Sequence, residues 1–242
     1  ANGRTFRTRS AENVLQELAS HHERYGVRLF HFGDLKLNSD VGLWRALSAG
    51  FQDAVPGGLW TCSVHVGGKG DQGMSDGDLA AARAGGCVRI TTGLETGSQR
   101  LLDRMKKGVK VSQLEAFLTS AKRAGISVRT SMFTGFPGEG PEDLDASAAL
   151  LERHVESVDR VHLSRFLLMP RTPITRAISE DPDRFPELRV SFGNARLEAL
   201  DHADRRIERR PYRRSLARLL RAVHRINRKH LPESARPLEG AM

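Results

Sequence analysis

The sequence predicts an α/β fold in which parallel strands alternate with crossover helices, followed by a basic helical extension. Short apolar segments alternate with amphipathic segments of helical length from the start of the chain to about residue 168. Glycines stand at several of the boundaries between them, where helices and strands usually end. The alternation then stops, and the remainder of the chain is rich in arginine.

Each element can be justified from its own residues. Ser10 is a typical N-cap, so a helix is expected to follow it and to end at Gly26, before a strand over 27–32. The further expected elements are helices over 39–52, 75–84, 98–107, 111–124 and 141–156, and strands over 59–66, 87–92, 126–134 and 158–168. Strands separated by helices imply a parallel sheet. Because the first element is a helix, we expect a further strand to precede it.

The C-terminal part is expected to be helical and basic. Leu197, Leu200 and Ile207, and later the apolar residues from Leu216 to Ile226, suggest two amphipathic helices separated at Pro211, after a loop that extends to Pro186. This divides the chain into a core (1–175) and a linker with a basic helical extension (176–242). From Asp201 onward there are 12 Lys/Arg against 5 Asp/Glu, whereas the first 200 residues hold 26 against 24. Such an extension can contact nucleic acid or an acidic partner, and a solvated helix is the simpler alternative.

Composition excludes several classes of protein. The chain has no apolar run near the roughly 20 residues that span a bilayer, and its first residues lack the apolar core of a signal peptide. The two cysteines, Cys62 and Cys87, lie in apolar strand segments without paired histidines, which argues against a metal site. A reduced, cytoplasmic setting is therefore expected.

The candidate functional residues stand where the expected strands end. Parallel barrels place their active sites at these carboxyl ends, where carboxylates can accept hydrogen bonds from a ligand. The residues there are Asp34, His65, Glu95, the turn from Gly135 to Glu139, Arg165 and, just beyond, Met169. Alternative roles remain open: Glu95 can cap the helix that starts at Ser98, Glu139 can complement the dipole of the helix that starts at Pro141, and His65 can be structural.

Several of these segments together resemble the radical S-adenosylmethionine (radical SAM) superfamily. They are Phe32-Gly-Asp34 with Asn38, Gly93-Leu-Glu95 with Gly97-Ser98, Leu101-Leu-Asp-Arg-Met-Lys-Lys-Gly108, Gly135-Phe-Pro-Gly-Glu139 and Arg171-Thr-Pro173. The resemblance covers about residues 4–173, in the family's order and spacing. The most similar branch contains cobalamin-dependent and methylthio-transferring members.

The resemblance implies a partial six-stranded (β/α) TIM-like barrel that binds S-adenosylmethionine and a 4Fe–4S cluster, with cobalamin as a further cofactor of this branch. It implies 5′-deoxyadenosyl-radical chemistry, for example methylation or methylthiolation, on a small-molecule, peptide or RNA substrate. Asp34 would lie near the methionine moiety, and Glu95 would approach the ribose hydroxyls. Met132, Phe133 and Gly135 would pack against adenine, and Leu168 and Met169 would help to close the pocket.

The sequence departs from the family at two points. Leu35 stands where many relatives have a second acidic residue, and the cluster-binding pattern C-x-x-x-C-x-x-C is absent. Neither Cys62 nor Cys87 has the spacing to replace it. We therefore expect a fragment that begins after the cluster loop, lacks the first strand and does not form the radical alone. The alternative is a non-catalytic nucleoside- or RNA-binding remnant of this fold.

Overall fold

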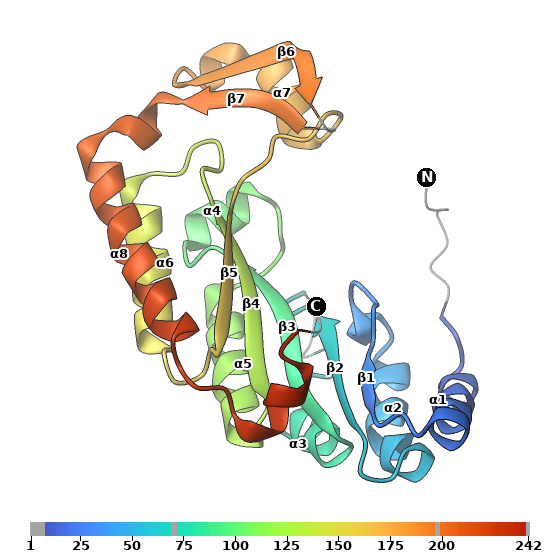
Figure 1. Cartoon of the computed structure of the whole chain (residues 1–242). Coiled ribbons are helices and arrows are strands. Elements are labelled where there is room, and N and C mark those ends of the chain that lie inside the picture. Colours follow the sequence, from blue (N-terminus) through green and yellow to red (C-terminus); the bar gives the residue numbers. More distant parts are fainter. Residues whose placement is uncertain (1–7, 69–71, 197–198, 241–242) are drawn as a thin grey trace.

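Five parallel strands form the centre of the protein in the computed structural model, which describes residues 8–68, 72–196 and 199–240. They are β1 (Leu29–His31), β2 (Leu59–Val64), β3 (Cys87–Glu95), β4 (Ser127–Thr134) and β5 (Arg160–Arg165). Their order in the sheet is their order in the chain, so every connection runs in one direction and the sheet curls into a half-barrel (Figure 1). The expected α/β fold of a partial TIM-like barrel is confirmed.

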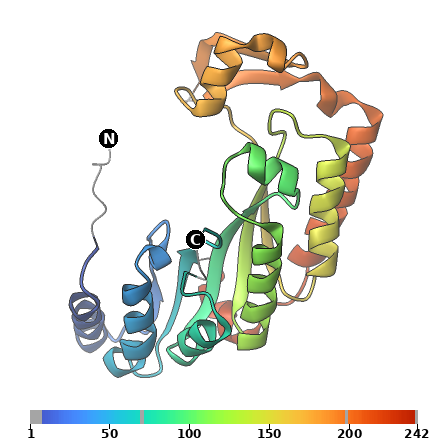
Figure 2. The ribbon, with the colours of Figure 1, turned by 180° about the vertical axis from the view of Figure 1, so that it is seen from behind.

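Helices cover the convex face of the sheet (Figure 2). They are α1 (Ala11–Tyr25), α2 (Val41–Ala54), α3 (Asp76–Ala84), α4 (Gln99–Arg104), α5 (Val111–Ala124) and α6 (Pro141–Arg153), with a short 3₁₀ helix η1 (Leu37–Ser39) before α2. The side chains of Ser10, Ser75 and Ser98 each accept a hydrogen bond from a backbone amide of the first turn that follows. These caps explain why the helices begin where the sequence predicts them.

The main core lies between the sheet and these helices. Trp44 and Phe51 of α2 pack against Trp60 of β2, and all three side chains are fully buried. The indole of Trp60 also donates a hydrogen bond of 2.8 Å to the carbonyl of Gly85, so its polar atom is satisfied. This core fixes the strands whose carboxyl ends carry the candidate residues.

The segment after β5 differs from the sequence-based expectation. The expected loop contains helix α7 (Pro173–Glu180) and the 3₁₀ helix η2 (Pro182–Arg184), and an antiparallel pair, β6 (Leu188–Arg196) and β7 (Ala199–Asp204), follows. The predicted helix around Leu200 is therefore wrong, and Leu197 lies outside the described residues. In β7 the inward positions are Leu200, His202 and Asp204, with exposed residues between them. Because two of these three inward residues are polar, the sequence lacks the alternation of apolar and polar residues that indicates a strand.

The hairpin and α7 enclose a second, small core beyond the carboxyl ends of the main strands, at the top of Figure 1. Its buried members are Leu168, Ile178, Phe185 and Leu200. The backbone joins this unit to the end of the barrel, because the amide of Leu200 donates a 2.8 Å hydrogen bond to the carbonyl of Leu168. The division of the chain at residue 175 stays a prediction.

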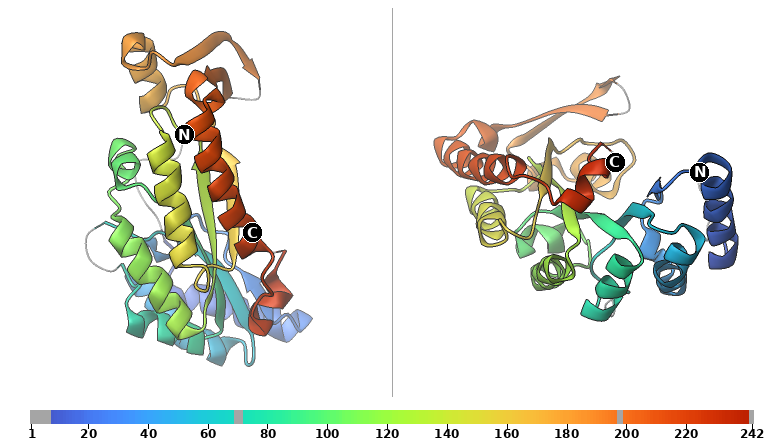
Figure 3. Two further views of the ribbon diagram at one scale, coloured as in Figure 1. Left: turned by 90° about the vertical axis from the view of Figure 1, so that its left-hand side faces the viewer. Right: turned by 60° about the horizontal axis from the view of Figure 1, so that its bottom comes forward.

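The basic helix of the extension is confirmed as α8 (Arg210–Asn227), which follows the 3₁₀ helix η3 (Arg205–Glu208) and packs along α6 (Figure 3). Pro211 lies in its first turn, where proline begins a helix rather than breaking one. A last 3₁₀ helix, η4 (Glu233–Leu238), then lies against the amino-terminal half of β3, inside the curve of the sheet (Figure 3). The chain thus crosses the whole height of the half-barrel after β7.

Candidate functional site

A cavity of about 340 Å³ lies at the carboxyl ends of β2, β3 and β4. Its polar lining comes from different elements: Lys36, Ser63, His65, Thr91, Thr92, Glu95, Lys107 and Ser131. This is the rim at which parallel barrels carry their chemistry. The cavity brings together one carboxylate, two ammonium groups, one imidazole and four hydroxyls.

Glu95 holds its place in this cavity through an unusual backbone conformation. Its φ angle is +60°, and the pairing of β3 with β4 shifts between Gly93 and Glu95. A left-handed non-glycine residue costs about 1 kcal/mol or more, and such strain is concentrated at functional sites. The conformation turns the carboxylate back over Gly93, where an added Cβ would lie 2.9 Å from Oε1. Lys107 donates a 2.8 Å hydrogen bond to the same oxygen.

The helix-cap alternative for Glu95 does not describe its contacts. The cap of α4 is the hydroxyl of Ser98, which accepts from the amide of Leu101. The carboxylate of Glu95 instead faces the cavity beside Lys107 and remains 23% exposed. It is therefore available to the hydroxyl groups of a ligand.

Asn38 positions the other side of this cavity, and sequence reasoning did not give it that role. Its side chain is buried and bonds both backbone groups of His65, donating to the carbonyl at 2.8 Å and accepting from the amide at 2.9 Å. The pKa of His65 is lowered, first by burial and then by the positive charges of Lys36 and Lys107. The lowered pKa favours the neutral form of the His65 imidazole. The only signal in the sequence was the spacing of Asn38 from Phe32-Gly-Asp34.

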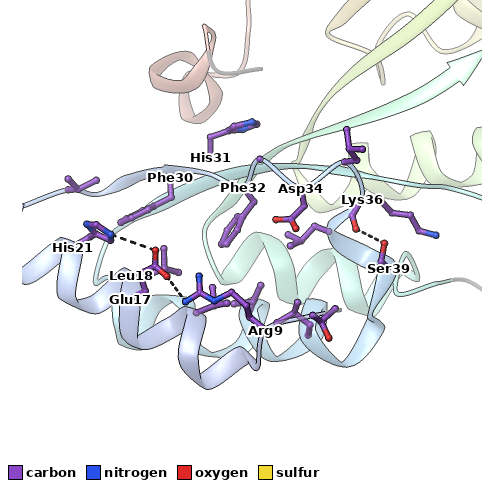
Figure 4. Close-up of a pocket in the computed structure, with 18 residues that line it drawn as sticks. Arg9, Glu17, Leu18, His21, Phe30, His31, Phe32, Asp34, Lys36 and Ser39 are labelled. Carbon is purple, nitrogen blue, oxygen red and sulfur yellow. Dashed lines mark hydrogen bonds and ion pairs between the residues drawn. The ribbon is translucent and has the colours of Figure 1, made fainter. Parts of the chain in front are cut away.

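Asp34 lines a different cavity, of about 670 Å³, between α1 and β1 (Figure 4). Phe30 and Phe32 form its apolar wall, and an ion pair between Arg9 and Glu17 (2.5 Å) lies across it. In the part of the chain that the structure describes, β1 pairs only with β2. The cavity therefore lies along the edge of β1 that has no neighbouring strand there. Leu35 and Lys36 line both cavities, and Asp34 and Glu95 therefore belong to neighbouring spaces.

The three candidate residues of β4 and the turn after it do not share one environment. The side chain of Met132 is buried in the main core. Phe133 points to the opposite face of β4 from Met132, the same face as Ser131, which lines the cavity. The ring centroids of Phe133 and Phe166 are 5.6 Å apart. Gly135 follows with a φ of +84°. Contact of a ligand with this strand end would therefore involve the ring of Phe133 and the backbone near Gly135.

Leu168 and Met169 lie under the hairpin and line neither of these two cavities. Leu168 is fully buried in the second core. The carbonyl of Met169 accepts hydrogen bonds from the hydroxyls of Thr172 and Thr175, and Thr172 is the N-cap of helix α7. Their role in closing the pocket stays a prediction.

Glu139 is held by residues distant in sequence. Its Oε2 accepts hydrogen bonds from the amide of Gly135 at 2.6 Å and from the hydroxyl of Tyr212 of α8 at 2.5 Å. Burial raises the pKa of Glu139 to about 7, although both hydrogen bonds oppose that rise. Among the described residues, its hydrogen bonds are with this turn and with α8, and none goes to an amide of α6.

The described residues do not supply the ligands of a 4Fe–4S cluster. Cys62 and Cys87 are buried on neighbouring strands, and burial, reinforced by Cys87, raises the pKa of the Cys62 thiol. Within residues 8–68, 72–196 and 199–240, no three His, Cys, Asp or Glu side chains lie close enough to hold a metal ion. Thiolates are needed to bind such a cluster, so these two cysteines do not fit the role.

Comparison with known sequences gives the family. The Radical SAM superfamily matches residues 1–151. An uncharacterized methyltransferase of Pyrococcus horikoshii is 29% identical over 60% of this chain and 30% of its own length. A tRNA-2-methylthio-N(6)-dimethylallyladenosine synthase of Anaeromyxobacter sp. is 34% identical over 47% of this chain and 25% of its own. The chain thus spans about a quarter to a third of these curated relatives.

Solved structures agree on the fold. The radical SAM methyltransferase TsrM of Kitasatospora setae, with cobalamin and a 4Fe–4S cluster bound, superposes with a TM-score of 0.59 at 22% identity, over 79% of this chain and 38% of TsrM. The cobalamin-dependent S-adenosylmethionine radical enzyme OxsB gives a TM-score of 0.69 at 14% identity, over 83% and 36%. The half-barrel, the strand-end motifs and the sequence match agree: the chain belongs to the radical SAM superfamily.

Proposed function

We propose that this chain holds the nucleoside part of S-adenosylmethionine at the carboxyl ends of β3 and β4, as part of an enzyme that transfers methyl or methylthio groups. The observation that carries the proposal is the carboxylate of Glu95, turned into the rim cavity by a strained backbone. The matched relatives are a methyltransferase and a methylthio-transferring synthase, which favours group transfer of this kind. The substrate class proposed is a small molecule, a peptide or RNA.

The residues present fit the nucleoside and not the cluster. Glu95 would accept hydrogen bonds from the ribose hydroxyls, and Phe133 with the backbone of Gly135 would contact adenine. Asp34, in the neighbouring cavity, would lie on the methionine side, and Leu168 and Met169 would support the far wall. Family membership implies S-adenosylmethionine and a 4Fe–4S cluster, which together supply radical chemistry when bound. No cluster ligand set exists in the described residues, so this chain's own contribution is binding and orientation.

Lys107 sets the electrostatics of the bound ligand. In the structure its ammonium group pairs with Glu95 at 2.8 Å and is 39% exposed. A ribose that bonds to Glu95 must share this carboxylate with Lys107, and the exposed lysine can move at little cost. The pairing holds the carboxylate of Glu95 at the cavity, where its oxygens can accept hydrogen bonds.

The test is binding of 5′-methylthioadenosine, which carries the ribose and adenine without the groups that contact a cluster. We expect the wild-type chain to bind it and Glu95→Gln to bind about ten- to a hundredfold more weakly, because a hydrogen bond to a charged acceptor contributes roughly 1.5–3 kcal/mol. Titration calorimetry measures both. The control is Glu142→Gln, a 71% exposed carboxyl of α6. Equal affinity of Glu95→Gln and wild type would remove Glu95 from the site.

A second candidate function, RNA binding by α8, rests on a separate observation. Arg210, Arg214 and Arg221 line one groove between α8 and the start of α6, and among the described residues none of the three forms an ion pair with a carboxylate. The fourth arginine of the groove, Arg218, is paired with Asp145 and Glu152. Exposed arginines without acidic partners attract phosphates. We propose that this groove contacts the RNA backbone.

The salt dependence of binding to a single-stranded RNA tests this candidate. Each neutralised phosphate steepens the plot of log affinity against log salt concentration by about 0.7. The variant with Gln at 210, 214 and 221 should therefore have a slope about 2 smaller in magnitude than that of the wild type. The control variant has Gln at 45, 123 and 153, which removes three arginines that are paired with Asp78, Asp76 and Glu115. Similar loss in both variants would show that total charge, not this groove, binds the RNA.

The state of the two cysteines bears on the cellular setting of the protein. None of the helices in the described segments is both long and apolar enough to cross a bilayer. Both cysteines are free and buried. We propose a reduced, cytoplasmic setting, where such thiols persist.

A further inference from the structure

Helix α8 reaches the strand end that is proposed to face adenine. Tyr212, in its first turn, is only 2% exposed, and its hydroxyl donates a 2.5 Å hydrogen bond to Oε2 of Glu139. The same oxygen accepts from the amide of Gly135 at 2.6 Å. One carboxylate oxygen therefore joins the end of β4 to a helix that begins 75 residues after Gly135 in the chain. Both bonds are short, and when Glu139 is ionised they are assisted by charge, which makes them stronger than ordinary hydrogen bonds.

Neighbouring residues enclose this junction. A Cβ added to Gly135 would lie 3.6 Å from Cδ1 of Ile207, so η3 rests on the turn. Arg206, held by Asp204, stands near enough to lower the pKa of Glu139, and Asp143 raises it. The segment from Asp204 to Tyr212 thus covers the turn from one side. It lies outside residues 1–151, which the superfamily matches.

The buried carboxylate needs both donors. Glu139 is 3% exposed, and an ionised group without hydrogen-bond partners is costly to bury. If the hydroxyl of Tyr212 is removed, the carboxylate loses its only described side-chain donor and is protonated more readily. A protonated carboxyl is a weaker acceptor for the amide of Gly135, so the turn is held less firmly.

We propose that Tyr212 is a positioning residue of the nucleoside site: through Glu139 it fixes the backbone of Gly135, so that the C-terminal helix sets the shape of the adenine side. The inference rests on the proposed function for its binding consequence. Its structural part, the fixing of Gly135, stands on the hydrogen bonds alone. This role of Tyr212 requires neither a second copy of the chain nor another partner, because both hydrogen bonds lie within one chain.

The experiment uses the whole chain without ligand and then with 5′-methylthioadenosine. In Tyr212→Phe, hydrogen exchange of the amides from Phe133 to Glu139 should be faster by roughly tenfold, the effect of one hydrogen bond to a charged group. Binding of the probe should weaken roughly tenfold as well. The matched control is Tyr25→Phe, the other tyrosine of the chain, which is 64% exposed on α1. It should change neither measurement.

Glu139→Gln separates positioning from general damage. If Tyr212 acts through this carboxylate, adding Tyr212→Phe to Glu139→Gln should weaken probe binding by less than twofold, because the two changes act on the same contact. Unchanged exchange in Tyr212→Phe, or faster exchange with unchanged binding, would overturn the inference. If the wild-type chain binds no probe, the proposed function fails, whereas the exchange data still decide whether Tyr212 fixes Gly135.

Discussion

Truncation of the chain after Lys229 is expected to lower the free energy of unfolding by about 3–5 kcal/mol, the usual cost of leaving a buried charge without its partners. The charge is Arg89 of β3, whose side chain is fully buried. Its guanidinium donates to the carbonyls of Leu238 at 2.7 Å and Ala235 at 2.9 Å, both in η4. Burial, aided by Arg129, already lowers the pKa of Arg89, so η4 supplies the compensation for that charge.

Urea unfolding followed by tryptophan fluorescence measures this effect, because Trp44 and Trp60 are both buried in the main core. Arg89→Met supplies the comparison, since it removes the charge and keeps an apolar side chain. In that background the same truncation should cost clearly less. An equal cost with Arg89 and with Met at this position would attribute the loss to the apolar contacts of Leu231 and Leu238 instead.

Raising the pH from 5 to 8 is expected to destabilise the wild type relative to Glu139→Gln by up to about 3 kcal/mol. Burial raises the pKa of Glu139 to about 7, above its ordinary value of 4.5. A raised acid pKa contributes stability that is fully present below 4.5 and is lost as the pH rises through 7. The groups facing Glu139 are Tyr212 and Arg206, which favour its ionised form, and Asp143, which opposes it.

The free energy of unfolding, measured against pH for both proteins, checks this prediction. The difference between wild type and Glu139→Gln isolates Glu139, because the titration of other groups, including His65, is common to both. Glu142→Gln, at an exposed carboxyl, should run parallel to the wild type. A wild type that gains stability over Glu139→Gln with rising pH would contradict the assigned direction of the pKa shift.

Local sequence signals predicted most of the half-barrel. Ser10, Ser75 and Ser98 begin helices and Gly26 and Gly125 end them, because caps act within a few residues. The hairpin of β6 and β7 was missed because its inward face includes His202 and Asp204, which carry no hydrophobic period. Helix α7 was missed because a run with Pro173, Pro182 and Pro186 resembles a loop. Proline is compatible with a first helical turn, which is where Pro173 stands.

The candidate site was predicted in part for the same reason. Strand ends identified Asp34 and Glu95, and both line cavities. Met132 and Leu168 stand at the right strand ends, but their side chains point into cores. The direction of a side chain follows from the pleat and from the register with neighbouring strands, and an irregular shift at Glu95 changes it. The sequence does not indicate the positioning role of Asn38, because that role depends on the backbone of His65, 27 residues away.

By itself, the sequence determined the alternation of strands and helices, the glycine-rich turns with their carboxylates and the basic character of the last long helix. These features depend on side-chain periodicity and on neighbours along the chain. The tertiary structure alone decided that Glu139 meets Tyr212 across 73 residues and that Arg89 meets Leu238 across 149. Such contacts arise from the packing of α8 and η4 on the half-barrel, which no local spacing encodes, and the buried charges gain their partners only when the chain is folded.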